Sequence, residues 1–195
     1  MDSADVLKTY EDTHALLKGH FRLSSGRHSD RYLQSAMVLQ YPWIAEKFCA
    51  ALAEQVRPLG AQLVLSPAMG GLFVGHELAR ALKVKSIFTE RNKETDAMEL
   101  RRGFSVQKGD KFFAVEDIIT TAKSIKESIK VLEELGAKLV GAGCLIDRTG
   151  GEAQRLFDVP VKALASLKIE SWEEQDCPLC KQGLPVVKPG SRAKF

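Results

Sequence analysis

The sequence predicts an α/β fold, with a central, mostly parallel, twisted sheet covered by helices on both faces. The first observation is an alternation, between residues 63 and 146, of short apolar runs with segments of helical periodicity. Apolar runs of about four to eight residues separated by helices are typical of parallel strands that are buried on both faces. The second is the placement of Gly70 and Gly71 between a strand-like and a helix-like segment, and of Gly136 directly after another helix-like segment.

The individual elements follow from the same patterns. In the second half of the chain we expect strands at residues 63–66, 85–90, 111–116 and 139–146, and helices at 72–82 and 121–135. Before them we expect a helix at 4–18, a strand from Phe21 leading into a polar turn, another strand at 31–39, and a helix from Pro42 to about Arg57. The polar segment from Asn92 to Gly103 is expected to be a long mobile loop, and the tail from Glu173 to be irregular.

Composition excludes several classes of protein. The net charge of +3 is too small a bias to favour nucleic-acid binding, but it suits a small anionic substrate in a positive cleft. No apolar run approaches the roughly 20 residues of a membrane span, and the acidic N-terminus is unlike a signal peptide. Four cysteines are too few for a disulfide framework in a chain of 195 residues. We therefore expect a cytoplasmic protein that binds neither membrane nor nucleic acid.

The segment from Phe112 to Ser124 carries the strongest functional signal. An apolar strand ends at Glu116 and Asp117, and the hydroxyl-rich turn 120–124 opens directly into a helix. Ligands of parallel sheets bind beyond the carboxyl ends of the strands, and a helix N-terminus offers unpaired N–H groups to a phosphate. We expect the acid pair to be exposed at the carboxyl end of a central strand, where it can accept hydrogen bonds from ribose hydroxyls. The alternative is a simple N-cap, Thr120 or Thr121, beside a solvated strand end.

This segment resembles the phosphoribosyl-pyrophosphate motif of the type I phosphoribosyltransferases. The resemblance implies that Glu116 and Asp117 face the ribose hydroxyls and that the following loop binds the 5-phosphate. The loop residues concerned are Ile118, Ile119, Thr120, Thr121, Ala122, Lys123 and Ser124. The family usually has Gly where this chain has Ala122, and often a small residue where it has Lys123. The resemblance also implies Mg²⁺, bound mainly through the substrate pyrophosphate, so that no metal ligands are expected from the protein.

Four further stretches are similar to the orotate phosphoribosyltransferases. They are a substrate-covering segment at residues 19–34, a pyrophosphate loop at 66–71, the pair Asp147–Arg148, and the tail 177–192. The resemblance implies that the chain is one domain, 1–195, with a core at about 41–159. A small hood is expected from residues 1–40 together with part of 160–195.

The resemblance also assigns substrate contacts. The pyrophosphate loop would bind through Ala68, Met69, Gly70 and Gly71, with a cis peptide bond between Ala68 and Met69. Arg148 would contact the base, since its planar guanidinium suits the carboxylate of orotate. The covering segment would contribute Ser25, Arg27 and Tyr32. Alternative roles are an ion pair of Arg148 with Asp147, a solvated turn for Arg27, and core packing for Tyr32.

Two features depart from the best-known members of this family. Ser24 stands where many have a substrate-contacting Lys, and the loop 90–103 is short and contains no His. We expect Arg91 and Lys93 to reach the pyrophosphate, although Arg101 and Arg102 are also available and all of them fit a solvated charged loop equally well.

The cysteines are assigned no functional role from the sequence. Cys177 and Cys180 have the spacing of half a zinc site, but no second pair lies at a suitable spacing, so a plain turn near the hood is expected. Cys49 and Cys144 fit buried positions in a helix and a strand.

The sequence therefore predicts a homodimeric enzyme that joins phosphoribosyl pyrophosphate to orotate, giving orotidine 5-phosphate and pyrophosphate in pyrimidine synthesis. The mobile loop of one subunit is expected to complete the active site of its neighbour. Two rival interpretations remain open at this stage. The first is a phosphoribosyltransferase for a purine base, and the second is a non-catalytic regulator that senses phosphoribosyl pyrophosphate.

Overall fold

A six-stranded sheet forms the centre of the molecule. The computed structural model describes residues 1–23 and 25–189, and within them the strand order is β5-β4-β3-β6-β7-β8. The strands are β3 (Leu63–Pro67), β4 (Lys85–Arg91), β5 (Met98–Leu100), β6 (Lys111–Ile119), β7 (Lys138–Asp147) and β8 (Val161–Ser166). All neighbours are parallel except β5, which pairs antiparallel with β4. The predicted fold class is confirmed.

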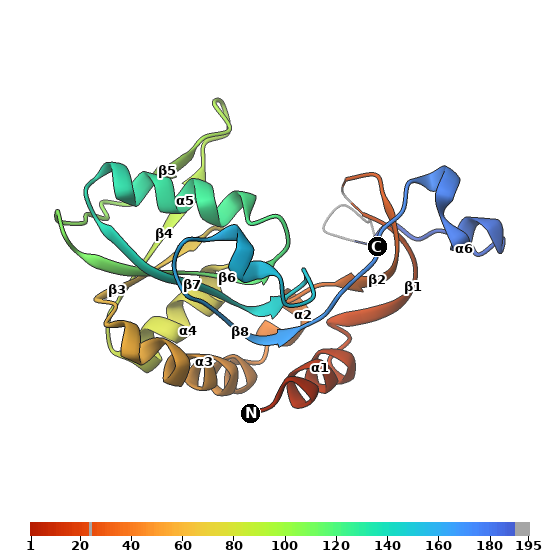
Figure 1. Ribbon diagram of the computed structural model, residues 1–195, viewed down its shortest axis with the longest axis horizontal. Helices are drawn as coiled ribbons and strands as arrows, with labels where there is room; N and C mark the ends of the chain where they lie inside the picture. The colour runs from red at the N-terminus through yellow and green to blue at the C-terminus, as the bar shows by residue number, and fades with distance from the viewer. Residues whose placement is uncertain (24, 190–195) are drawn as a thin grey trace.

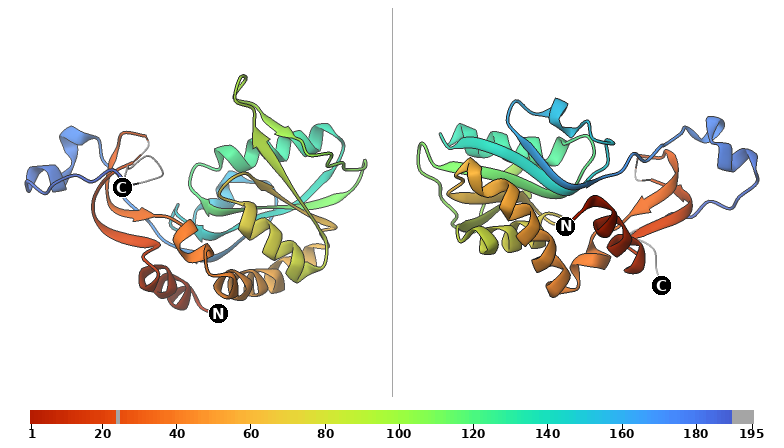
Figure 2. Two further views of the ribbon diagram at one scale, coloured as in Figure 1. Left: turned by 180° about the vertical axis from the view of Figure 1, so that it is seen from behind. Right: turned by 60° about the horizontal axis from the view of Figure 1, so that its bottom comes forward.

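Helices cover both faces of this sheet (Figures 1 and 2). One face carries α1 (Ser3–Asp12), α3 (Pro42–Val56) and α4 (Leu72–Leu82), and the other carries α5 (Lys123–Glu134). Each layer has its own apolar core, which is expected where a sheet is buried on both sides. No helix in the described part of the chain is long and apolar enough to cross a membrane.

A separate two-stranded sheet stands beyond the end toward which the parallel strands run (Figure 1). Its antiparallel strands are β1 (Leu16–Arg22) and β2 (His28–Leu33), and their register shifts between Lys18 and Phe21. The C-terminal segment runs back along this hairpin: Val187 bridges to Phe21, and Trp172 bridges to His28. A short helix, α6 (Pro178–Lys181), lies between these two contacts in the sequence. We call this hairpin, together with the returning C-terminal segment, the hood.

Three sequence predictions about secondary structure are wrong. The first helix ends at Asp12 rather than residue 18, because His14 adopts a left-handed backbone conformation (φ 56°) and the chain turns there into β1. The expected strand at 31–39 stops at Leu33, and residues 36–39 form the short helix α2 (Ala36–Leu39), which buries Val38 and Leu39.

The third error concerns the first edge of the sheet, where the strand β5 lies inside the segment 92–103 that was expected to be a loop. At the opposite edge, the strand β8 was not predicted. The helices at 42–56 and 72–82 and the other parallel strands agree with prediction to within a few residues. The strand before the acid pair runs on through it to Ile119, so the pair lies inside β6 rather than after it.

Candidate functional site

The acid pair lies near the carboxyl end of β6, at the centre of the sheet. Glu116 and Asp117 are both half-buried, whereas the sequence predicted an exposed pair. Burial, together with the neighbouring Asp117 carboxylate, raises the pKa of Glu116 to about 8. Burial also raises the pKa of Asp117, although the nearby Ser35 hydroxyl and the Ile118 backbone N–H oppose that rise. A carboxyl group with such a pKa can donate a hydrogen bond as well as accept one near neutral pH.

The loop after β6 presents backbone N–H groups at the start of α5. Ala122 precedes the helix in a left-handed conformation (φ 59°, ψ 17°) and has no side chain that could cap it. In the described part of the chain, no protein group accepts a hydrogen bond from the N–H groups of residues 121–124. The first N–H groups of a helix lack intrahelical partners and lie at the positive end of its dipole. This geometry suits an anion such as the predicted 5-phosphate.

The loop between β3 and α4 faces the acid pair. Its Ala68–Met69 peptide bond is cis, which confirms the sequence prediction. A Cβ atom added to Gly70 would stand 2.9 Å from Oδ1 of Asp117, so this loop touches the acid pair directly. Met69 is 79% exposed, and the N–H groups of Met69 and Gly70 donate no hydrogen bond within the described residues. The loop therefore offers a second set of free donors beside the first.

Arg148 follows β7 at the same edge of the sheet. The sequence left open an ion pair with Asp147, but Asp147 is buried and accepts hydrogen bonds from its own loop, from N and Oγ1 of Thr149 and from N of Gly151. Arg148 is half-buried, and burial lowers the pKa of its guanidinium. It forms no ion pair with any described residue. A half-buried guanidinium without a carboxylate partner is a good ligand for a planar anion.

Comparison with known proteins identifies the family. The family model described as the phosphoribosyl transferase domain matches residues 43–175. The orotate phosphoribosyltransferase of Desulforamulus reducens is 48% identical over 192 residues, which cover 98% of each chain. That of Caldicellulosiruptor bescii is 45% identical over 194 residues and the full length of both chains. The chain belongs to the orotate phosphoribosyltransferase family.

Solved structures agree with this assignment at the level of the fold. The orotate phosphoribosyltransferase of Aeropyrum pernix is 26% identical, with a TM-score of 0.69 over 83% of this chain and 93% of that chain. The adenine phosphoribosyltransferase of Rhodothermus marinus has a TM-score of 0.66 over 84% of this chain and 99% of that chain, at 20% identity. The fold is thus shared with transferases of a different base, and base choice depends on the site itself.

The covering segment expected from the orotate phosphoribosyltransferase family is the β1–β2 hairpin. Ser25 is exposed in its turn, and Ser24 lies outside the described residues. The guanidinium of Arg27 is held by the C-terminal segment, with an ion pair to Glu173 and a 3.0 Å hydrogen bond to Oγ of Ser171. Tyr32 is half-buried, and its ring centroid lies 5.9 Å from that of Phe21. In this conformation Arg27 supports the hairpin instead of pointing freely into a site.

The segment expected to be the family's mobile loop is a hairpin. Residues 92–97 form its turn, and β5 pairs back onto β4 through Thr89–Leu100 and its neighbours. Arg91 forms an ion pair with Glu127 of α5 and a second, longer one with Asp96. Lys93 is exposed in the turn, and no described residue forms an ion pair with it. Of the two cations that the sequence favoured, Lys93 is therefore the more available.

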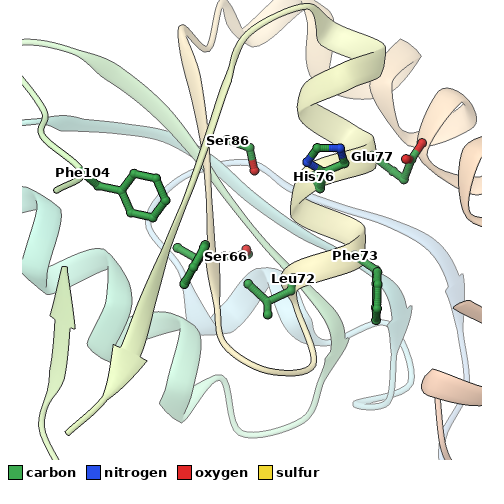
Figure 3. A pocket seen from close by; sticks show the side chains of 8 residues that line it. Ser66, Leu72, Phe73, His76, Glu77, Ser86 and Phe104 are labelled. Atoms are coloured by element: carbon green, nitrogen blue, oxygen red, sulfur yellow. The ribbon is translucent and has the colours of Figure 1, made fainter. Parts of the chain in front are cut away.

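A cavity of about 470 Å³ lies between α4 and β4, behind the pyrophosphate loop (Figure 3). Phe73 and Phe104 stand at its two sides, and the Oγ atom of Ser66 is buried there without a hydrogen-bond partner among the described residues. None of the predicted substrate ligands lines it. This cavity is therefore separate from the acid pair, from the N–H groups at the start of α5 and from Arg148.

One group of side chains in the hood was missed by sequence analysis. His20 and His28 lie beside Cys177 and Cys180, and one ligand atom of each lies within 4.8 Å of those of the other three. The sequence showed only the cysteine pair, because the histidines are far away in the chain and fit no zinc spacing.

Proposed function

We propose that this chain transfers the ribose 5-phosphate of phosphoribosyl pyrophosphate to orotate, giving orotidine 5-phosphate and pyrophosphate. One observation carries the proposal. The half-buried guanidinium of Arg148 lies at the carboxyl end of the sheet together with the acid pair and the N–H groups at the start of α5, and within the described residues neither this guanidinium nor these N–H groups have a protein partner. That end thus has a group for each part of the two substrates: the base carboxylate, the ribose hydroxyls and the 5-phosphate.

The reaction requires positioning more than acid–base chemistry. A ring nitrogen of orotate forms a bond to the anomeric carbon and gives up its proton, while the bond to pyrophosphate breaks and its electron pair leaves with pyrophosphate. Asp117 and Glu116 would hold the ribose hydroxyls, and the loop 68–71 would donate hydrogen bonds to the departing pyrophosphate. Preorganised donors of this kind stabilise charge that develops in the transition state. The hood would exclude water that competes for the sugar.

The donor set at the site fits Mg²⁺ that arrives with the substrate. Mg²⁺ prefers oxygen ligands and usually keeps substrate phosphate oxygens and waters. The acid pair offers carboxyl oxygens, but in the described part of the chain no third potential ligand lies close to it. When bound, Mg²⁺ would neutralise charge on pyrophosphate. Glu116 and Asp117 would orient the ribose hydroxyls and could contribute carboxyl oxygens to the ion.

The role of Arg148 can be tested by comparing orotate with uracil, which lacks the carboxylate. A hydrogen bond to a charged group contributes about 1.5–3 kcal/mol, so Arg148→Met should lower kcat/KM for orotate by about 10- to 200-fold. It should change the much slower turnover of uracil far less. Arg155→Met, an exposed arginine that pairs with Glu152 on the surface, is the matched control. If Arg148→Met lowered kcat/KM equally for orotate and uracil, Arg148 would not be the ligand of the orotate carboxylate.

We also propose that the enzyme is a homodimer in which the β4–β5 hairpin serves the neighbouring site. The hairpin projects away from the body of its own subunit in two views (Figures 1 and 2). Trp43 of α3 and Phe73 of α4 are 66% and 62% exposed, and Phe73 borders the cavity between α4 and β4. Large exposed aromatic side chains are enriched at protein interfaces, and a second copy of this chain is the occupant proposed here.

Mixing two inactive variants tests this arrangement. One carries Glu116→Ala with Asp117→Ala, and the other carries Arg91→Ala with Lys93→Ala. If the hairpin acts across the interface, each mixed dimer has one intact site, so random mixing restores about a quarter of wild-type activity by two-fold symmetry. If the hairpin acts within its own subunit, mixing restores nothing. Each variant alone is the control, and a monomer by light scattering at assay concentration would refute the dimer.

We also propose that the enzyme is cytoplasmic. None of the four cysteines, all of which the structure describes, forms a disulfide, which suits a reducing compartment. Fractionation of the source cells, with the activity followed by orotate consumption, would test this location.

A further inference from the structure

The histidine and cysteine group in the hood has the dimensions of a tetrahedral metal site. Nε2 of His20 lies 2.9 Å from Nδ1 of His28, and 3.5 and 3.7 Å from the Sγ atoms of Cys177 and Cys180. Sγ of Cys180 lies 3.2 Å from Nδ1 of His28. With zinc–nitrogen bonds of about 2.0–2.1 Å and zinc–sulfur bonds of about 2.3 Å, the edges of a tetrahedron are about 3.3–3.8 Å. The two distances from His20 to the cysteine sulfurs match these edges, and those from His28 to His20 and to Cys180 are somewhat shorter. All four ligand atoms lie within 4.8 Å of one another, so small shifts would bring them to tetrahedral spacing.

A hydrogen bond on the side of His20 away from the group selects the ring tautomer that a metal requires. Nδ1 of His20 lies 2.8 Å from the carbonyl oxygen of Leu184, which can only accept a hydrogen bond. Nδ1 therefore carries the proton, and Nε2, which faces the group, presents a lone pair. Metal-bound histidines commonly donate their second N–H to a carbonyl or carboxylate in this way.

The group is also shielded from water. Cys177 is fully buried, His28 and His20 are 2% and 5% exposed, and Cys180 is half-buried. All four positions are filled by protein side chains, with no open position for substrate. Closed sites of two Cys and two His are typical of structural zinc.

The surrounding part of the hood is outside the apolar core of the molecule. Neither apolar core cluster includes any described residue from 18–32 or 168–189. The C-terminal segment is joined to the hairpin by backbone hydrogen bonds, including N of Val187 to O of His20 and N of His28 to O of Trp172, both 2.8 Å. Small units without a sufficient core commonly depend on a metal or a disulfide.

We propose that these four side chains bind a structural zinc ion. The ion joins β1 and β2, through His20 and His28, to the C-terminal segment, through Cys177 and Cys180. It thereby fixes the hairpin whose turn carries Ser25 and Arg27. This proposal is independent of the orotate assignment, because the group shares no residue with the proposed active site.

Metal content of the full-length chain tests the proposal directly. The protein is purified without a polyhistidine tag, dialysed against metal-free buffer and analysed by inductively coupled plasma mass spectrometry. We expect about one zinc ion per chain, as for a closed structural site. Growth with Co²⁺ should give the intense visible bands of tetrahedral cobalt and a thiolate-to-cobalt charge-transfer band. Removal of the metal should lower the midpoint of thermal unfolding, and added zinc should restore it.

Variants identify the ligands. Cys177→Ser and His28→Gln should lose most of the zinc and the charge-transfer band. Cys49→Ala and His76→Gln are the matched controls, since Cys49 is buried in α3 and His76 is exposed on α4, and both should retain the zinc. If the ligand variants do not fold, the zinc content and the cobalt spectrum of the wild-type chain still show whether it has a tetrahedral, thiolate-ligated metal site.

Four results would overturn the proposal. The first is a wild-type chain that binds neither zinc nor cobalt. The second is a disulfide between Cys177 and Cys180, detected by mass after alkylation. The third is iron in place of zinc, and the fourth is full zinc retention by both ligand variants.

Discussion

Replacement of Glu116 by Gln should stabilise the folded protein at alkaline pH while it weakens substrate binding. Burial raises the pKa of Glu116 to about 8. Between the ordinary carboxyl pKa and this value, the folded state binds a proton that the unfolded state has released. The free energy of unfolding therefore falls as pH rises through this window. Gln has nearly the same shape and stays neutral at every pH.

The size of the effect follows from the shift. A rise from 4.5 to about 8, at about 1.4 kcal/mol per pKa unit, corresponds to at most about 5 kcal/mol. Water that reaches the half-buried carboxylate reduces this limit, so we expect Glu116→Gln to be more stable than wild type by about 2–4 kcal/mol above pH 8. Below the ordinary pKa of 4.5, where Glu116 is protonated in both the folded and the unfolded state, the two proteins should differ little. Burial raises the pKa of Asp117 too. Asp117 is present in both proteins, so its contribution to the free energy of unfolding does not account for the difference between them.

Urea denaturation followed by tryptophan fluorescence at several pH values, without Mg²⁺, measures this difference. Glu133→Gln, at an exposed position on α5, is the control and should follow the wild-type profile. The same Glu116→Gln protein should bind phosphoribosyl pyrophosphate more weakly, because the site loses a carboxylate. Parallel pH profiles for wild type and Glu116→Gln would refute the reasoning, since they would mean that the carboxyl has the same pKa in both states.

Two glycine-to-alanine substitutions, at Gly75 and Gly70, give further predictions about stability and substrate binding. A Cβ on Gly75 would stand 2.4 Å from Oγ of buried Ser66, so Gly75→Ala should lower the free energy of unfolding by about 1–3 kcal/mol, as overpacking does; unchanged stability in urea would contradict this. A Cβ on Gly70 would press on Asp117 instead, so Gly70→Ala should raise KM for phosphoribosyl pyrophosphate by about tenfold, or about 1.4 kcal/mol, with little change in stability. An unchanged KM would show that the β3–α4 loop and Asp117 of β6 are not in contact during turnover.

The main sheet and the acid pair were predictable because their signals are local. The parallel strands that were predicted each contain a short apolar run, and the acid pair, the following loop and the helix succeed one another within one short segment. β8, whose sequence VKALAS is interrupted by a lysine, gave no such signal. The errors in the N-terminal part arose where periodicity is ambiguous. Leu16 and Leu17 fit a helix face as well as a strand, and only the left-handed conformation of His14 separates the two.

The features that the sequence did not predict depend on contacts between distant residues. His20 and Cys177 are 157 positions apart, so no spacing rule relates them until the C-terminal segment folds onto the hairpin. Arg91 was chosen for its charge and its place in the loop, whereas its pairing with Glu127 depends on how α5 packs beside β4. The burial of the acid pair likewise results from the loops that converge on it, so its raised pKa could not be read from the strand alone.

A single competition experiment decides whether the enzyme uses orotate or a purine base. The wild-type chain is given phosphoribosyl pyrophosphate and Mg²⁺ with equal amounts of orotate, adenine, hypoxanthine and xanthine, and the nucleotide products are separated and identified. We expect orotidine 5-phosphate as the dominant product, with equal release of pyrophosphate. A purine nucleotide as the main product, or tight binding of phosphoribosyl pyrophosphate with no nucleotide formed from any base, would contradict it.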